Sequence, residues 1–470
     1  MSLLHWSLIV LHAVLGLAAA GHALLTKRDP QTAFGWIAVC LIFPLGGPLL
    51  YYLFGINRVR TRAQKLQTRA TAAALPRSEA AMSRVMVPPE FSELARISDA
   101  VTGLPLTEAN RVDLLHNGEQ AYPAMLAAID AARRHVYLAT YIFETNRTGV
   151  QFIDALARAR ARGVDVRVLI DGAGELYSRP RAGKELRAHG IAVARFLPPR
   201  LVPPAWHINL RNHRKILVAD GAVAFTGGMN IGDRHLAGDA GNPARVVDVH
   251  FRLSGPVVRQ IQQVFVHDWL FVTGELLAPV TPAADGGGSA ICRTLVDGPD
   301  EDLGKLEMVL IGAISAARSR IAIMTPYFLP QRALIAALQT AALRGVDVRL
   351  ILPAHNNLRY LHWAARNVLG ELLHEGVRVY YQPGPFVHAK LFVVDDHYAQ
   401  VGSANLDPRS LRLNFELMVE LYDPPFAQEL ARHIEQVRQR SHELHPQELD
   451  ARRLAVRLRD ALMWLFAPYL

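Results

Sequence analysis

The sequence is poor in cysteine, with only Cys40 and Cys292 among 470 residues. Two cysteines, one of them inside an apolar stretch, do not make the disulfide framework of a small secreted domain, so we expect a reducing compartment for the soluble part. The sequence also lacks a Cys/His cluster with zinc spacing and an acidic loop of the calcium type. It therefore predicts neither a metal site nor a cofactor.

Charged side chains are missing from two stretches near the amino terminus, 3–25 and 32–56. Each is long enough to cross about 30 Å of hydrocarbon as a helix. Pro44 and Pro48 would kink the second stretch, which either spans the membrane or re-enters it. A cleaved signal peptide is the alternative for the first stretch, but the amino end lacks the positive charge of such peptides. We expect a transmembrane helical hairpin over residues 1–58.

Basic residues are more numerous after the second apolar stretch than between the two. After it come Arg58, Arg60, Arg62 and Lys65, whereas the connection holds Lys27 and Arg28 beside Asp29. The larger basic excess marks the cytoplasmic side, so we expect a multi-pass protein whose remaining chain faces cytoplasmic anionic lipid. The formal net charge of +9 also favours anionic partners, either acidic lipid headgroups or nucleic acid.

The rest of the chain is duplicated. The hexapeptide RGVDVR occurs at 162–167 and again at 344–349, and each copy follows a similar stretch of helix end and apolar strand, 128–144 and 313–329. A hydrophobic strand follows each hexapeptide. Such strand–helix–strand units imply parallel pairing in an α/β sheet.

A segment rich in Pro and Gly separates the two copies and is typical of a linker. We expect the following organisation: a transmembrane hairpin over 1–58, a connecting region over 59–106, a first lobe over 107–275, a linker over 276–297, a second lobe over 298–440 and an amphipathic tail over 441–470. The tail combines arginines with leucines. A helix of this kind either lies in the lipid interface or packs against the second lobe, and both remain open.

Each copy carries the pattern H-x-K-x4-D-x6-G-[GS]-x-N. Its members are His213, Lys215, Asp220, Gly227, Gly228 and Asn230 in the first copy and His388, Lys390, Asp395, Gly402, Ser403 and Asn405 in the second. On a strand, residues two apart point to the same face, so the histidine and lysine can converge on one anion. The glycines let the backbone turn close to a ligand, and the asparagine supplies an amide donor.

Two copies related by a pseudo-two-fold axis would surround one phosphate with two of each group. That set suffices for phosphodiester exchange, in which one imidazole attacks phosphorus and the other donates and then accepts a proton. Four side chains would bind the non-bridging oxygens: Lys215, Lys390, Asn230 and Asn405.

A nucleophilic histidine needs an acid to hold its other ring nitrogen. The candidates are Asp248, downstream of His213, and Glu416, downstream of His388. Asp220 and Asp395 belong to the motif and are counted with its catalytic residues. Because they end strands, we interpret them as turn and framework residues.

The paired motifs resemble the signature of the phospholipase D superfamily, and nearly the whole chain is similar to bacterial cardiolipin synthases. Four further segments carry this resemblance: 44–58, 227–239, 325–330 and 402–416. The resemblance implies two pseudo-symmetric α/β/α lobes of the phospholipase D fold, each with a mixed, largely parallel sheet. It implies that His213 is the nucleophile and His388 the acid and base, with no metal. Arg234 stands where relatives often carry an acid, which bears on headgroup preference.

The implied reaction joins two phosphatidylglycerol molecules into cardiolipin and releases glycerol at the bacterial inner membrane. The same residues also serve hydrolytic phospholipases D, other phosphatidyltransferases and nucleases. A nuclease would use the positive charge to bind phosphates but needs no membrane spans, and a base-stacking aromatic series is missing. We therefore expect membrane phospholipids as partners, without nucleic acid or an obligate protein partner.

Overall fold

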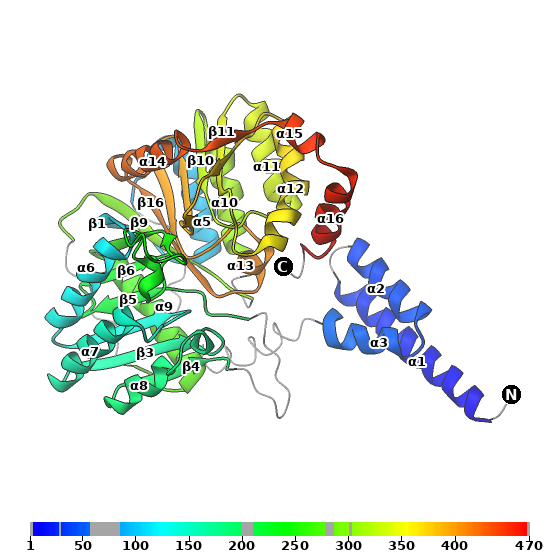
Figure 1. Ribbon diagram of the computed structural model, residues 1–470, viewed down its shortest axis with the longest axis horizontal. Helices are drawn as coiled ribbons and strands as arrows, with labels where there is room; N and C mark the ends of the chain where they lie inside the picture. The colour runs from blue at the N-terminus through cyan, green and yellow to red at the C-terminus, as the bar shows by residue number, and fades with distance from the viewer. Residues whose placement is uncertain are drawn as a thin grey trace. The chain divides into compact units, whose positions relative to one another are not determined.

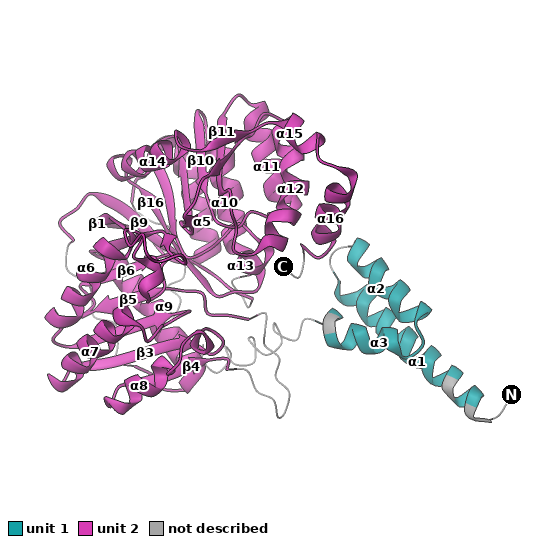
Figure 2. Ribbon diagram, in the orientation of Figure 1, with its two compact units in different colours: residues 1–66 teal, residues 67–470 magenta. Residues whose placement is uncertain are grey.

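The computed structural model describes residues 3–27, 30–56, 85–198, 210–277, 286–299 and 303–467. The chain divides into two compact units, 1–66 and 67–470 (Figure 2). Several predicted features lie outside the described residues: Arg28 and Asp29, the basic residues Arg58, Arg60, Arg62 and Lys65, and residues 278–285 of the expected linker.

The amino-terminal unit begins with helix α1 (Leu3–Thr26). Among the described residues, α1 is the one helix long and apolar enough to cross a membrane, judged by length and composition. The second apolar stretch is broken, because α2 (Pro30–Ile42) ends before Pro44 and the chain continues as α3 (Gly46–Leu50) and a π-helical turn, η1 (Tyr51–Gly55). Tyr51 and His22 join this turn to α1 through a hydrogen bond of 2.7 Å.

The second unit is built around one sheet of fifteen strands (Figure 1). Its strands are β1 (Thr107–His116), β2 (His135–Thr140), β3 (Asp165–Asp171), β4 (Ala192–Phe196), β5 (Ile216–Ala219), β6 (Val223–Gly227), β8 (Val249–Ser254), β9 (Ala290–Asp297), β10 (Arg320–Met324), β11 (Asp347–Pro353), β12 (Arg378–Gln382), β14 (Leu391–Val394), β15 (Tyr398–Gly402), β16 (Glu416–Tyr422) and β17 (His442–Leu444). The spatial order is β17-β12-β11-β10-β14-β15-β16-β9-β1-β8-β6-β5-β2-β3-β4. A separate two-stranded sheet pairs β7 (Val246–Val247) with β13 (Phe386–Val387).

The predicted α/β class and the parallel pairing of the strand–helix–strand units are confirmed. β2, β3 and β4 run parallel to one another, and so do β10, β11 and β12. The expectation of a largely parallel sheet is wrong, because the other neighbouring strands are antiparallel. The motifs themselves cause this difference: each forms a hairpin with a short turn, which joins antiparallel strands.

The two halves of the sheet are continuous. β1 pairs with β9 through Thr107 opposite Cys292 and Asn110 opposite Ala290. Residues 290–297, which the composition assigns to the linker, therefore form a strand in the middle of the sheet.

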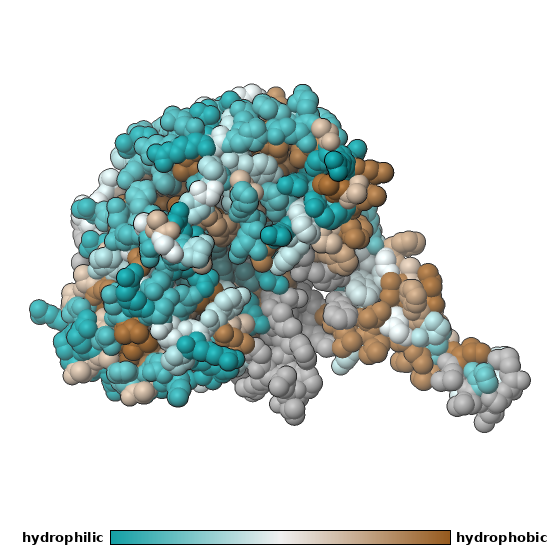
Figure 3. Space-filling model, viewed as in Figure 1, coloured by the Kyte–Doolittle hydropathy of each residue, from teal (hydrophilic) through white to brown (hydrophobic). Residues whose placement is uncertain are grey.

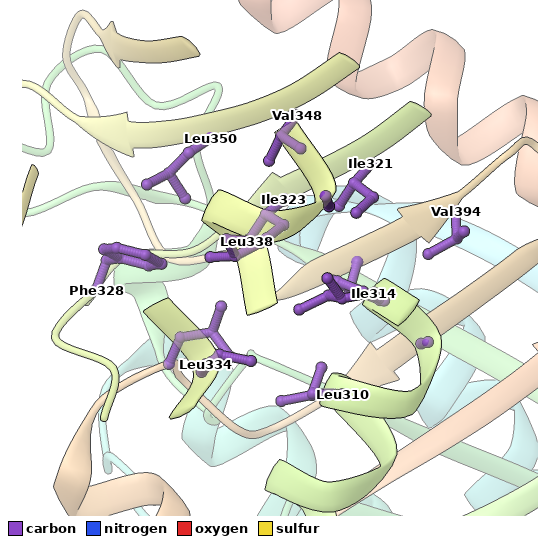
Figure 4. Close-up of a cluster of buried hydrophobic side chains, with 14 of the residues drawn as sticks. Leu310, Ile314, Ile321, Ile323, Phe328, Leu334, Leu338, Val348, Leu350 and Val394 are labelled. Atoms are coloured by element: carbon purple, nitrogen blue, oxygen red, sulfur yellow. The ribbon is translucent and has the colours of Figure 1, made fainter. Parts of the chain in front are cut away.

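Helices cover both faces of this sheet. Alternate side chains of β10 illustrate the two layers, because Ile321 and Ile323 join one buried cluster whereas Ala322 and Met324 join another. Helices α5 (Ser92–Thr102), α10 (Lys305–Ala316), α11 (Arg332–Leu343) and α12 (Arg359–His374) supply the first cluster, part of which Figure 4 shows. In the first half, α6 (Asn117–Ala131), α7 (Arg147–Ala161) and α8 (Ala182–Ala188) cover the corresponding strands. Helices α9 (Val257–Thr273) and α14 (Pro424–Arg438) lie on the opposite face.

Shorter helices complete the second unit. These are η2 (Pro89–Phe91), η3 (Gly174–Tyr177), η4 (Asp233–His235), α13 (Pro408–Arg412), α15 (Pro446–Asp450) and α16 (Leu454–Leu465). Helix α16 packs beside α12 (Figure 1).

Candidate active site

Each motif forms a strand, a turn and a second strand. His213 and Lys215 precede β5, and the chain returns as β6; in the second half the corresponding hairpin is β14–β15. β5 and β14 are buried along their whole length. Both histidines therefore stand at the start of a rigid central strand, which fixes their main-chain positions.

The motif aspartates lie at the other ends of these strands. The carboxylate of Asp220 accepts the main-chain N–H groups of 133–135, and that of Asp395 accepts those of 318–320. Burial acts to raise the pKa of both carboxyl groups, but these hydrogen bonds bring it below the ordinary value. Asp220 and Asp395 also occupy left-handed turn positions, with φ of 54° and 51°. Their contacts are those of framework residues.

Each histidine is held by a segment from the other half of the chain. The N–H of His213 donates to the carbonyl of Phe415 over 3.0 Å. The N–H of His388 donates to the carbonyl of Val247 over 2.8 Å, at the end of the β7–β13 pairing. The residue after each of these carbonyls is a predicted acid, so the main-chain pairing determines which acid meets which histidine.

The acids are exchanged between the two halves. Nδ1 of His213 lies 3.0 Å from Oε1 of Glu416, and Nδ1 of His388 lies 3.1 Å from Oδ2 of Asp248. Both predicted acids thus contact a motif histidine, although each contacts the histidine of the opposite copy. The two carboxylates are fully buried, whereas each imidazole is 12% exposed. The histidines therefore have their acids on the protein side and an accessible edge.

The two imidazoles share one site. Their ring centroids are 6.4 Å apart, with the planes at 77°. Tyr141 lies edge-on to His213 at 5.4 Å, and Tyr327 lies edge-on to His388 at 6.3 Å. Tyr177, which is 60% exposed, lies 6.4 Å from Tyr141, so aromatic side chains border the pair of histidines.

Both motif lysines are buried beside the histidines. Nζ of Lys390 lies 2.9 Å from each ring nitrogen of His388, and Nζ of Lys215 donates to the carbonyl of His213 over 2.6 Å. Burial lowers the pKa of Lys215 to about 7, although Glu416 acts to raise it. Burial likewise lowers the pKa of Lys390 to about 8, against the opposing effect of Asp248. Because burial destabilises both lysine cations, a bound anion would stabilise them, and the two together form a receptor for an anion.

Burial also lowers the pKa of both histidines. For His213 the attraction of Glu416 partly offsets burial. The pKa of His388 falls well below the ordinary value, because Lys390, Lys215 and His213 add to the effect of burial. Without an anion in the site, both imidazoles are therefore neutral near pH 7.

The acids are held differently in the two halves. Glu416 accepts hydrogen bonds from the hydroxyl of Ser403 over 2.5 Å and from Nδ2 of Asn414 over 3.1 Å. At the position that corresponds to Ser403, a Cβ on Gly228 would stand 2.5 Å from the carboxylate of Asp248. The first copy of the motif therefore has glycine where the second has serine, because the carboxylate of Asp248 lies too close to the main chain to leave room for a side chain. Burial raises the pKa of Glu416, but His213 and Lys215 bring it below the ordinary value.

The motif asparagines are buried in the loops that follow β6 and β15. Oδ1 of Asn230 accepts the N–H of Ile142 over 3.1 Å, which leaves its amide nitrogen as the donor. Nδ2 of Asn405 donates to the hydroxyl of Ser410 over 3.1 Å, and its buried Oδ1 has no hydrogen-bond partner among the described residues.

Sequence reasoning missed two features of the site. Tyr141 was not singled out, although it follows β2 as Tyr327 follows β10. Arg214 and Asp268 form a buried ion pair, and Nε of Arg214 donates to the carbonyl of Glu416 over 3.1 Å. Arg234, the departure noted in the sequence, pairs with Glu144. Among the described residues, no group of three or more His, Cys, Asp or Glu side chains is placed to hold a metal ion.

Solved structures share this fold. The phosphatidylserine synthase of Haemophilus influenzae aligns with a TM-score of 0.61 at 17% identity, over 81% of this chain and 100% of its own. The amino-terminal region, residues 14–55, matches the family described as "Phospholipase_D-nuclease N-terminal". The fold and the twin motifs together define a protein of the phospholipase D class.

Sequence comparison narrows this class. The family described as "Cardiolipin synthase, PLD-like domain" matches residues 125–269 and 310–438. Cardiolipin synthase A of Pseudomonas aeruginosa is 35% identical over 97% of this chain and 94% of its own length. Cardiolipin synthase of Geobacillus kaustophilus is 33% identical over 95% and 90%, respectively. The chain belongs to the cardiolipin synthase family, which confirms the resemblance seen in the sequence.

Proposed function

We propose that this protein is a phosphatidyltransferase that joins two phosphatidylglycerol molecules into cardiolipin and releases glycerol. The observation that carries the proposal is one site in which the ring centroids of two imidazoles lie 6.4 Å apart, with two buried lysines beside them. Family membership supports the substrate class. The site offers two lysines and two neutral imidazoles, the requirements of phosphodiester exchange without a metal.

In the first half-reaction, Nε2 of His213 attacks phosphorus and the bond from phosphorus to the glycerol oxygen breaks. Glu416 accepts a hydrogen bond from the Nδ1–H of His213, which keeps the lone pair on Nε2. His388 donates a proton to the leaving oxygen, so glycerol departs neutral. The product is a phosphatidyl group bonded to His213.

In the second half-reaction, the terminal hydroxyl of another phosphatidylglycerol gives its proton to His388 and attacks phosphorus. The bond from phosphorus to Nε2 breaks, which restores His213 and yields cardiolipin. Lys215 and Lys390, with amide nitrogens of Asn230 and Asn405, bind the non-bridging oxygens; losing one such donor typically costs about 10² to 10³ in rate.

His388 becomes protonated when the negatively charged substrate binds. In the free site, burial and the two lysines depress the pKa of His388. A bound phosphodiester places a negative charge between these cations and weakens their effect on the imidazole, so the pKa of His388 rises. Asp248 stabilises the imidazolium that then forms.

The two halves act as pseudo-symmetric lobes in this proposal. The strand order supports it, since reading outward from the β1–β9 pair meets corresponding strands, such as β5 and β14 or β2 and β10. The amino-terminal unit would anchor the lobes in the inner membrane as a hairpin, with both termini in the cytoplasm. The domain boundaries proposed from the sequence, 107–275 and 298–440, then apply to the lobes apart from strands β9 and β17.

A single-substrate assay tests the function. Purified full-length protein in vesicles of phosphatidylglycerol is expected to produce cardiolipin and glycerol in equal amounts, measured by mass spectrometry. Phosphatidic acid as the main lipid product would indicate that water is the acceptor, and the hydrolytic alternative would replace transfer. Lipid left unchanged while added DNA is cleaved would contradict both.

The pH profile of the reaction tests the lysines. The two ammonium groups must be charged to bind phosphate oxygens, and their pKa values are lowered to about 7 and about 8. We expect kcat/KM to fall more steeply as the pH rises through this range, because the free enzyme then loses the lysine protons in addition to the proton of His388, whose pKa is already lowered. The acid limb should lie below pH 6.5, the ordinary value, because the pKa of His213 is lowered.

Initial rates at low substrate from pH 5 to pH 10 give this profile, with circular dichroism as the control for unfolding. In kcat the alkaline limb should move upward, since bound phosphate favours the charged lysines. A level kcat/KM up to pH 10 would show that the two lysines do not bind the phosphate.

A further inference from the structure

The carboxy-terminal helix α16 has inverted polarity. Helices on the surface of a globular protein normally bury an apolar stripe and expose their charged side chains. In α16 the fully buried side chain is that of Asp460, whereas Leu454 is 70% exposed and Leu458 is 62% exposed. Packing against the second lobe therefore does not explain the leucines.

The exposed leucines form one continuous face. At 3.6 residues per turn, Leu454, Leu458, Leu462 and Leu465 fall within about 80° of one another around the helix axis, and Asp460 lies on the opposite side. Phe466, 51% exposed, extends this face beyond the last turn. Figure 3 shows hydrophobic surface over α16. We call these five residues the outer face of α16.

The helix is fixed in place by its other side. Asp460 pairs with Arg452 over 2.5 Å and with Arg459 over 2.6 Å. The guanidinium of Arg459 lies 4.2 Å from the ring centroid of Trp363 on α12. Met463 and Trp464 pack, partly buried, against the core cluster of the second half. A buried ion cluster and an aromatic contact thus attach the opposite side of α16 to the second half, which leaves the outer face exposed.

Positive charge accompanies the outer face. Arg453 and Arg457 are exposed and stand within a turn of Leu454 and Leu458. A second protein surface would have to be both apolar and acidic to match this pattern. An anionic bilayer has both properties, since acyl chains take the leucines and headgroup phosphates take the arginines.

We propose that the outer face of α16 is a docking surface for an anionic phospholipid bilayer. The leucines enter the boundary between headgroups and acyl chains, and Arg453 and Arg457 bind headgroup phosphates. This contact would hold the second lobe against the surface that contains its substrates. It rests on the proposed function only in the identity of those lipids.

A fluorescent label on the outer face tests the docking. The native cysteines are fully buried, so a Leu458→Cys variant of the full-length protein takes an environment-sensitive dye selectively. In vesicles of phosphatidylglycerol and phosphatidylcholine, spin labels on the acyl chains should quench this dye about twofold, because an interfacial helix buries its apolar face about 5–10 Å deep. Leu343→Cys, also 70% exposed but on α11, is the matched control and should stay unquenched.

Three results would overturn the proposal. The first is an unquenched dye at position 458. The second is equal quenching in pure phosphatidylcholine, which would remove the anionic requirement. The third is a spectral shift that grows with protein density in the bilayer without acyl-chain quenching, which would identify a second copy of the chain as the occupant.

Activity gives an independent readout. A triple variant, Leu454→Gln, Leu458→Gln and Leu462→Gln, leaves the histidine site untouched. We expect it to need several-fold more phosphatidylglycerol in vesicles for half-maximal rate, with unchanged turnover of short-chain phosphatidylglycerol dispersed in detergent. Equal loss in both assays would overturn a docking role. A wild-type protein without transferase activity would refute the proposed function, while the quenching experiment would still decide on docking.

Discussion

Replacing His213 by alanine is expected to abolish both transfer and the covalent intermediate. The imidazole is the proposed nucleophile, so kcat should fall by about 10⁴-fold or more, as when a nucleophile is removed from other enzymes. The measurement is a rapid quench in alkaline detergent with phosphatidylglycerol labelled at phosphorus. Wild-type protein should carry label in a form stable to base and labile to acid, as a phosphorus–nitrogen bond requires.

The companion variant is His388→Ala. This variant lacks the group that donates and accepts the proton, so kcat should fall by a factor of about 10² to 10⁴. With a leaving group that needs no proton, such as p-nitrophenolate, this variant should release one equivalent and retain the label, because the acceptor hydroxyl has no base. His189→Ala, an exposed histidine that follows α8, is the control and should behave as wild type. Label retained by His213→Ala and lost from His388→Ala would reverse the two roles.

Much of this site can be predicted because the motif that carries the catalytic residues occurs twice in the chain. The spacing of His213 and Lys215 matches that of His388 and Lys390, and two residues along a strand fix which side chains share a face. The framework role of Asp220 and Asp395 also follows from local sequence, since each stands at the end of an apolar strand. Local patterns suffice where the cause is local.

The parts that could not be predicted depend on contacts between distant segments. Nothing in the spacing of Asp248 and Glu416 indicates that each reaches the opposite histidine, because this exchange depends on the pairing of Asn212 with Phe415 and of β13 with β7. Strand β9 was hidden in the expected linker for the same reason. Its partners, β1 and β16, lie far away in the sequence.

The sheet direction was mispredicted because the hexapeptide repeats reveal only the parallel units. The hairpins β5–β6 and β14–β15 place antiparallel strands between those units and the centre of the sheet. The motif that carries the chemistry therefore also sets the topology. In each half, the strand that follows the histidine turns back as the second strand of the hairpin. This return brings the glycines and the asparagine beside the histidine.

Replacing the acid that holds His213 should slow the attack on phosphorus. Replacing Glu416 by glutamine keeps the shape of a fully buried side chain but introduces an N–H donor beside Nδ1 of His213. That donor favours the tautomer whose proton is on Nε2, the atom that must attack phosphorus. We expect a loss of about 10² to 10⁴ in the first half-reaction, by analogy with the tautomer effect in the serine protease triad. Glu429→Gln, exposed on α14, is the control.

Asp248→Asn should act on the other step, although Asp248 belongs to the same half of the chain as His213. Its partner is Nδ1 of His388 at 3.1 Å, so the variant loses the stabilisation of the imidazolium that protonates glycerol. A phosphatidyl ester of p-nitrophenol needs no such proton. With this ester, Asp248→Asn should release a full burst of p-nitrophenolate, whereas the burst of Glu416→Gln should remain slow.

Rescue of Glu416→Gln by this substrate, with Asp248→Asn remaining slow, would mean that each acid serves the histidine of its own half. Rescue of Asp248→Asn alone fits the exchanged pairing, and stopped-flow absorbance of p-nitrophenolate separates the two cases in a single turnover. The exchange also makes each step depend on both halves of the chain. A half that folded alone would hold a histidine without its acid, so the lobes become competent for chemistry only when β7 pairs with β13 and Asn212 pairs with Phe415.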